Sequence, residues 1–167
     1  MALLEIKKYP DPILKKKSYE VEKITDEIKK LIEDMAETMK KNNGVGIAAP
    51  QVGVLKRIIV IETENGIVPF INPKIIKKSK EKETMEEGCL SFPGVFLKIK
   101  RPKEVEIEAL NKEGKKIKAK GLLARILQHE IDHLDGILLI DRLSFLGKIK
   151  FKIKYEFNRR FNKRKLA

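Results

Sequence analysis

The sequence is poor in the residues that stabilise small proteins through covalent or aromatic contacts. Its 167 residues include one cysteine, Cys89, and no tryptophan. A lone cysteine excludes an intramolecular disulfide. No stretch approaches the roughly 18 apolar residues that a membrane-spanning helix needs, and the first residues lack the apolar core of a signal peptide. We therefore expect a cytoplasmic protein with no membrane partner.

Acidic residues are scarce at the C-terminal end. Glu156 is the only acid from Lys148 to Lys165, where nine residues are lysine or arginine, and the whole chain has a formal net charge of +13. Such a tail favours a polyanionic partner, although a solvated basic face has the same composition. The excess of lysine and glutamate suits a heat-adapted protein, but an AT-rich genome also favours lysine, so the source stays open.

Hydrophobic periodicity predicts helices at both ends of the chain and strands between them. The segment 25–41 has apolar residues at helical spacing, with Thr25 as N-cap. Strand-like runs follow at 56–62, 66–72, 73–79, 102–110 and 115–120. Asn65-Gly66 and Glu113-Gly114 are typical of tight turns. A second helix is predicted from about Leu122 to Leu134.

The tail pattern is compatible with two structures. Ile149, Phe151, Ile153 and Tyr155 alternate as in a strand, whereas Ile149 and Ile153 begin a spacing-of-four ridge that continues to position 161. We expect a helix, because the ridge extends further than the alternation. The fold class is then α+β: one domain, residues 1–167, with antiparallel strands around a central helix, an N-terminal helix and a C-terminal helix in the basic tail, 148–167.

Both histidines of the chain lie in QHEIDHLDG, residues 128–136. His129 and His133 are four residues apart, so on a helix their imidazoles share one face. HExxH is short enough to occur by chance, but the surrounding helix is apolar, and polar side chains in a buried helix need partners. We therefore interpret the pair as metal ligands.

A catalytic metal has three protein ligands and one open position. The pattern HExxHxxGxxH would place the third ligand at residue 139, which is Leu139. A downstream glutamate would have to be Glu156, which lies within the basic tail. Cys89 remains, and a thiolate with two imidazoles is a sound site for Zn²⁺ or Fe²⁺.

Three stretches together resemble the signature motifs of the peptide deformylases: GVGIAAPQ (44–51), EGCLS (87–91) and HEIDH (129–133). Their order, their spacing and the chain length are similar as well. The resemblance implies removal of the formyl group from N-formylmethionyl peptides. It also implies Fe²⁺ as the native ion, with Zn²⁺ or Ni²⁺ able to replace it.

The resemblance implies a role for each site residue. Cys89, His129 and His133 would bind the metal, and Glu130 would act as the general acid and base. Gln51 and the Leu90 backbone N–H would donate to the developing oxyanion. The backbone at Gly46 would pair with the extended peptide. The methionine pocket would be lined by Val45, Met85, Leu122 and Ile126.

Three further expectations follow from the same resemblance. Glu87 and Arg101 would form an ion pair that steadies the cysteine segment. Phe96 stands where many members have an arginine beside the peptide path, so this chain is expected to bind the peptide backbone differently in detail, with the same chemistry. Some deformylases use a C-terminal helix on the ribosome, and the basic tail here would dock there; DNA is not expected as a partner.

Two other functions compete with this one. An HExxH metallopeptidase would cleave internal peptide bonds, but the sequence lacks the third-ligand pattern of either large class. A basic RNA-binding or ribosome-binding protein with a structural metal would need a fourth ligand, and the chain has no further cysteine or histidine.

Overall fold

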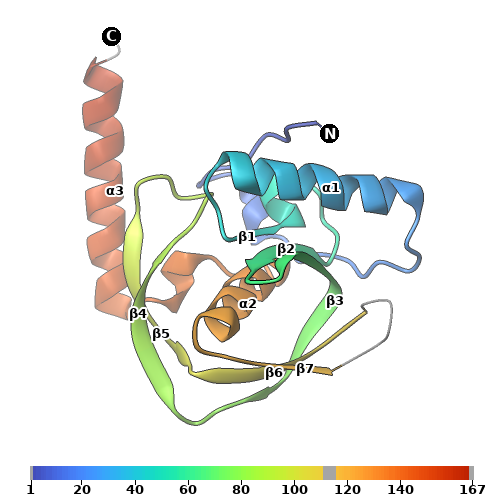
Figure 1. Cartoon of the computed structure of the whole chain (residues 1–167). Coiled ribbons are helices and arrows are strands. Elements are labelled where there is room, and N and C mark those ends of the chain that lie inside the picture. The colour runs from blue at the N-terminus through green and yellow to red at the C-terminus, as the bar shows by residue number, and fades with distance from the viewer. Residues whose placement is uncertain (1, 111–115, 166–167) are drawn as a thin grey trace.

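The structure is a computed structural model that describes residues 2–110 and 116–165. Its elements follow one another as η1 (Pro12–Lys15), α1 (Asp26–Lys41), β1 (Gly46–Ala48), η2 (Ala49–Val52), β2 (Ile58–Thr63), β3 (Gly66–Lys78), β4 (Lys82–Gly88), β5 (Phe96–Pro102), β6 (Glu104–Leu110), β7 (Lys116–Lys120), α2 (Gly121–Leu134), η3 (Leu139–Arg142) and α3 (Phe145–Lys165). Strands surround α2, α1 covers one side, and α3 projects away (Figure 1). The predicted α+β class with a central HExxH helix is confirmed.

The strands form two antiparallel groups. In the described residues, β1, β2, β3, β6 and β7 make one sheet in that order, and β4 pairs with β5. The predicted strands 66–72 and 73–79 are wrong as separate elements, because both lie in β3. β3 pairs with β2 through its first half and with β6 through its second, and the register of the β3–β6 pairing shifts twice. At the bend Asn72 has a φ of 52°, and its side chain both accepts from and donates to the backbone of Val21.

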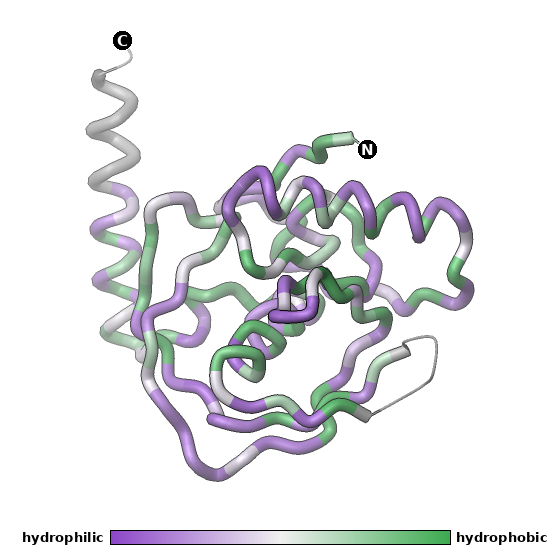
Figure 2. The backbone as a smooth tube through the Cα atoms, viewed as in Figure 1, coloured by the Kyte–Doolittle hydropathy of each residue, from purple (hydrophilic) through white to green (hydrophobic). Residues whose placement is uncertain are grey.

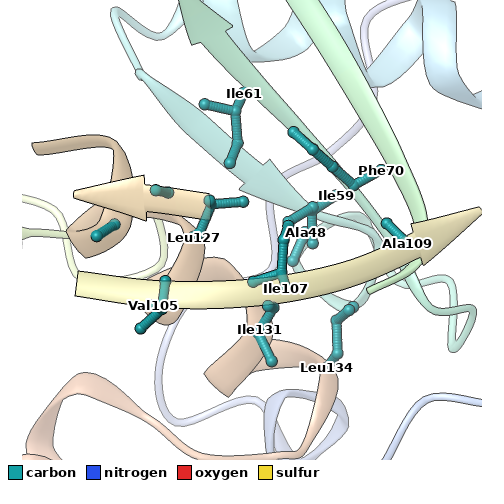
Figure 3. Packing of buried hydrophobic residues seen from close by; sticks show 12 residues of the cluster. Ala48, Ile59, Ile61, Phe70, Val105, Ile107, Ala109, Leu127, Ile131 and Leu134 are labelled. Atoms are coloured by element: carbon teal, nitrogen blue, oxygen red, sulfur yellow. The ribbon is translucent and has the colours of Figure 1, made fainter. Parts of the chain in front are cut away.

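β2 is buried on both faces, which explains its uninterrupted apolar run. Ile59 and Ile61 pack in the same cluster as α2. Ile58 and Val60 point the other way and pack in a second cluster with Met35 and Met39 of α1. Because successive residues of a strand point to opposite faces, one strand contacts both helices; Figure 3 shows the α2 side, with Ile59 and Ile61.

α2 has one face in the core and another that is free to carry chemistry. Leu127, Ile131 and Leu134 pack against the large sheet (Figure 3). The apolar interior around α2 contrasts with the hydrophilic outer side of α1 in Figure 2. His129 and His133 lie on a different side of the helix from these core residues, and Glu130 lies at the edge between the two sides. The core contacts of α2 therefore determine which way HExxH points.

The terminal helices confirm the predictions. The Thr25 hydroxyl accepts from the Ile28 N–H at 3.4 Å as N-cap of α1, and α3 is a helix rather than a strand. The first turns of α3 are attached to the body through aromatic packing. There the Tyr155 hydroxyl donates to the Tyr9 carbonyl at 2.9 Å, and Phe151 contacts Tyr9 and Phe92.

None of the helices in the described residues is both long enough and apolar enough to cross a membrane. The predicted turn at Glu113-Gly114 lies outside the described residues. The segment around it connects β6 to β7, which pair with each other from Glu104 opposite Lys120.

Candidate metal centre and active site

Three potential metal ligands from two distant segments meet beside α2. Cys89 follows directly after β4, and His129 and His133 lie one turn apart on α2. Their ligand atoms all lie within 4.8 Å of one another, and the Cys89 Sγ is 3.2 Å from His133 Nε2. Two ligands of one tetrahedral zinc ion lie roughly 3.6 Å apart, given the usual bond lengths. The three side chains therefore fit a shared metal ion.

The electrostatics of the cluster also fit a cation. Burial raises the pKa of the Cys89 thiol, but the imidazoles of His133 and His129 lower it well below its ordinary value. Burial lowers the pKa of His129, but hydrogen bonds with Cys89 and Glu87 raise it to about 10. Positive charge is thus favourable among these groups, and a divalent cation provides it while displacing the protons.

Glu87 orients the first histidine. Its Oε2 lies 3.0 Å from His129 Nδ1. Burial would raise the pKa of Glu87, but hydrogen bonds from His129 and Arg101 lower it to about 2. The carboxylate is therefore ionised and can only accept, so Nδ1 carries a proton. Nε2 is then the ring nitrogen that is left to bind a metal, once the metal displaces its proton. His133 differs, because its buried Nδ1 has no hydrogen-bond partner among the described residues.

Two buried arginines hold Glu87 in place. The expected pair with Arg101 is present, with its Nε 2.7 Å from Oε1 and its Nη2 3.0 Å from Oε2 of Glu87. Arg125 of α2 donates to the same Oε1 at 2.6 Å and to backbone carbonyls of β4 and β5. Sequence reasoning missed Arg125, although a charged residue within the apolar run LLARIL was a signal that a buried partner exists.

The network continues along α2 to Asp132. Arg101 Nη1 donates to Asp132 Oδ2 at 2.7 Å. Arg142 of η3 donates to both oxygens of the same carboxylate. Asp132 is buried, so it is a structural acceptor and not a surface group. A continuous chain of ion pairs thus connects the cysteine segment, α2 and η3.

Glu130 is a buried carboxylate whose environment is unusual. It is 5% exposed, and its Oε2 has no hydrogen-bond partner among the described residues. Burial raises its pKa. Gly46 of β1 lies directly against it: a Cβ at that position would be 2.6 Å from Glu130 Oε1. The glycine therefore leaves room for the glutamate, a reason that sequence reasoning missed, and the carboxylate lines the pocket beside the ligands.

Gln51 is fixed with its amide nitrogen toward the ligands. Its Oε1 accepts from the Ala48 N–H at 2.8 Å. Its Nε2 therefore faces the other way, 3.2 Å from the Ser91 hydroxyl and 3.5 Å from the Cys89 Sγ. Ser91, which sequence reasoning did not single out, completes this arrangement. A buried amide donor is thus oriented toward the site before any substrate binds.

A pocket of about 570 Å³ opens beside this cluster. Of the residues expected in it, Val45, Gly46, Gln51, Cys89, Leu90, Leu122, Ile126, His129 and Glu130 line it. Val45 is 54% and Leu122 61% exposed, so both present apolar surface to the pocket. Met85 does not line the pocket; it lies opposite the buried Ile99 in the β4–β5 pair. His133 lies deeper, at 1% exposure.

Fold and site define a class of protein. An α+β domain has the architecture of a metal-dependent hydrolase when it carries HExxH on a buried helix, a candidate third ligand from a separate segment, and a buried carboxylate beside them. The family model of polypeptide deformylase matches residues 3–148. The chain belongs to the polypeptide deformylase family.

Similar proteins support this membership over the whole chain. The peptide deformylase of Thermodesulfovibrio yellowstonii is 51% identical over 163 residues, which cover 93% of this chain and 98% of that protein. The crystal structure of the Thermotoga maritima peptide deformylase has a TM-score of 0.82 at 44% identity, covering 86% of this chain and 99% of that one. The Legionella pneumophila structure has a TM-score of 0.86 at 38% identity, covering 98% and 99%.

Members of this family are hydrolases that remove the N-terminal formyl group of new polypeptides, and this chain has that activity. The two competing functions, an internal peptidase and an RNA-binding protein with a structural metal, are therefore rejected.

Proposed function

We propose that the chain deformylates N-formylmethionyl peptides at the cluster of Cys89, His129 and His133, with Glu130 as the catalytic acid and base. The observation that carries this proposal is the buried Glu130 carboxylate. Its Oε2 has no hydrogen-bond partner in the part of the chain that the structure describes, and it lines the same pocket as Cys89 and His129. A solvated helix carboxylate would not be 5% exposed.

The thiolate and two imidazoles would hold Fe²⁺ as the native ion, and Zn²⁺ or Ni²⁺ suit the same donor set. When bound, the ion supplies a Lewis acid that makes water nucleophilic near neutral pH and polarises the formyl oxygen.

Glu130 moves the protons of the reaction. It takes a proton from the attacking water and later delivers that proton to the leaving amine of methionine. Its raised pKa favours the protonated form between these two steps, because a carboxyl with an ordinary pKa would release the proton more readily. Gly46 keeps the carboxylate close to the pocket, since any Cβ there would displace it.

Gln51 and the Leu90 backbone N–H would stabilise the negative charge that develops on the formyl oxygen. The fixed orientation of the Gln51 amide supports this role. A donor that is oriented in advance does not have to reorganise during the reaction, and losing one such donor typically costs about 10²–10³ in rate.

The substrate peptide would bind as an added strand. Within residues 2–110 and 116–165, β1 pairs with β2 alone and so forms an edge of the large sheet. The backbone edge of such a strand can accept an extended peptide. Gly46 lies on β1 and lines the pocket. The methionine side chain would then contact Val45, Leu122 and Ile126. Met85 is not part of this proposal, because it is not among the residues that line the pocket.

The direct test measures formate released from formyl-Met-Ala-Ser by the metal-loaded protein. We expect steady turnover by the wild type and a loss of nearly all turnover in Glu130→Ala, with an unchanged metal content. A Glu130→Ala protein that carries its metal and keeps activity within a few-fold of the wild type would refute the role of Glu130. Absence of formate release by the loaded wild type would refute the function itself.

We also propose that residues 1–167 act as one catalytic domain, because α2 packs against both the large sheet and β5 of the smaller one. The cytoplasm is its expected place, because formylated chains are made there. New chains carry formylmethionine as they leave a bacterial-type ribosome, so an enzyme docked there through the basic tail, 148–167, would meet its substrate early. Lys148, Lys150, Lys152 and Lys154 begin this tail on α3; the side chains of Arg159, Arg160, Lys163, Arg164 and Lys165 lie outside the described residues.

Ribosome docking predicts a steep salt dependence, because binding to a polyanion releases counterions. Reversing the charge of Arg159, Arg160, Lys163 and Arg164 should reduce co-sedimentation with ribosomes while turnover of formyl-Met-Ala-Ser is retained. Unchanged co-sedimentation of that active variant would show that the tail is a solvated surface only.

A further inference from the structure

Phe96 is an exposed aromatic residue whose position is nevertheless well defined. It begins β5 directly opposite Gly88 of β4 and is 65% exposed. A Cβ at Gly88 would lie 2.9 Å from Cε1 and 3.2 Å from Cδ1 of the Phe96 ring. One edge of the ring therefore lies over the bare glycine, while most of the side chain remains exposed to solvent. Any side chain at position 88 would push it away.

The Phe96 ring lies close to the active site. Gly88 and Phe96 both line the pocket, and Cys89 follows Gly88 directly. Residues directly opposite each other share one face of a strand pair, so Gly88 and Phe96 lie on the face opposite Glu87 and its network. The ring consequently forms part of the outer rim of the pocket, next to a metal ligand.

We propose that Phe96 is a specificity-determining residue that binds an apolar side chain of the substrate downstream of formylmethionine. This inference rests on the proposed function. The inner pocket surface of Val45, Leu122 and Ile126 is assigned to methionine, so the rim is left for a residue further along the peptide. An apolar side chain lying on the exposed ring would remove apolar surface of both groups from water.

The charged groups at the rim do not favour one sign. Lys8 and Glu86 both line the pocket and both are exposed, so they carry opposite charges in the same region. Phe96 itself has no hydrogen-bond donor for a substrate carboxylate, unlike an arginine in its place. We therefore expect the substrate preference to follow apolar surface, with acidic side chains disfavoured next to the ring.

The experiment compares kcat/KM for formyl-Met-Xaa-Ser and formyl-Met-Ser-Xaa, with Xaa as Phe, Ser or Glu. The two peptide series identify which downstream residue meets the ring. In wild type we expect Phe to exceed Ser in one series, and Phe96→Ala should lower that ratio roughly 5- to 10-fold, the loss of one aromatic contact. Phe96→Arg should raise the rate for Glu relative to Phe in the same series.

Lys98→Ala is the matched control. Lys98 lies two residues along β5 on the same face, is exposed and does not line the pocket, so the Phe-to-Ser ratio should stay at the wild-type value. Equal rates for Phe and Ser in both series for the wild type would overturn the inference, and so would a Phe-to-Ser ratio within two-fold of wild type in Phe96→Ala. Either result leaves formate release itself intact, so it is distinct from a failure of the proposed function.

Discussion

Replacing Glu87 by glutamine should weaken metal binding although Glu87 contacts no metal. Its Oε1 accepts from Arg101 and Arg125, and its Oε2 accepts from Arg101 and lies against His129 Nδ1. A glutamine would place one oxygen and one NH₂ group at the positions of these two carboxylate oxygens. Whichever way the amide turns, its NH₂ group faces donors where an acceptor stood.

Two magnitudes follow from this geometry. If the NH₂ group faces His129, Nδ1 must become the acceptor and the proton moves to Nε2, where it blocks ligation; loss of such an orienting partner typically costs about 10- to 100-fold in metal affinity. The two arginines also lose a buried counter-charge. Breaking a buried ion pair costs about 3–5 kcal/mol, which lowers the melting temperature of a chain of this size by roughly 6–20 °C.

The assay titrates metal-free protein with Zn²⁺ or Co²⁺ in competition with a chelator and records thermal melts of the same samples. Glu83→Gln is the control, because it removes an exposed carboxylate from the same strand. A Glu87→Gln protein that binds metal within two-fold of wild type would refute the reasoning about the His129 tautomer, whatever its stability. An unchanged melting temperature would refute the argument about the buried charges.

Four other predictions are simpler. Cys89→Ala should abolish stoichiometric metal in elemental analysis, because one of three protein ligands is lost; full occupancy would contradict the ligand set. Gly46→Ala should keep its metal but lose at least about 10-fold in kcat, since the new Cβ displaces Glu130; a wild-type kcat would disprove this. In air the Fe²⁺ form should lose activity faster than a Ni²⁺ form, because a thiolate beside a redox-active ion is open to oxidation, and equal half-lives would argue against it. The hydrogen bond from Lys30 lowers the pKa of Asp34 in the folded protein. The ionised Asp34 therefore stabilises the fold above the pKa of the unfolded chain, near 3.8, and this stabilisation disappears as the pH falls through the lower pKa of the folded state. Asp34→Asn should make the free energy of unfolding less dependent on pH below about pH 4, and an unchanged pH dependence there would exclude the role.

The sequence predicted those helices whose apolar stripe is also the face that the rest of the protein buries. The helix at 25–41 has a matching N-cap and an apolar stripe that is buried as expected. The helix with HExxH has an apolar face that the sheet covers. In both cases the periodicity in the sequence and the tertiary contacts point to the same structure, so local reasoning was sufficient.

The β4–β5 pair was missed for a physical reason. β4 reads KETMEEG, with mostly exposed residues and a single buried one, Glu87. Neither apolar alternation nor turn residues mark such a strand. The buried Glu87 pairs with Arg101 and Arg125, which follow it by 14 and 38 residues in the chain. Contacts at these separations leave no local pattern.

The three motifs of this chain combine residues that contact different atoms of one site. In EGC, Glu87 sets the proton on His129, Gly88 leaves room for the Phe96 ring, and Cys89 offers its sulfur. Gly46, from the first motif, makes space for Glu130 of the third. Each of these small or charged residues contacts a residue from another segment, so the site needs all three motifs together. This interdependence explains why three short stretches, each weak by itself, together identify the chain.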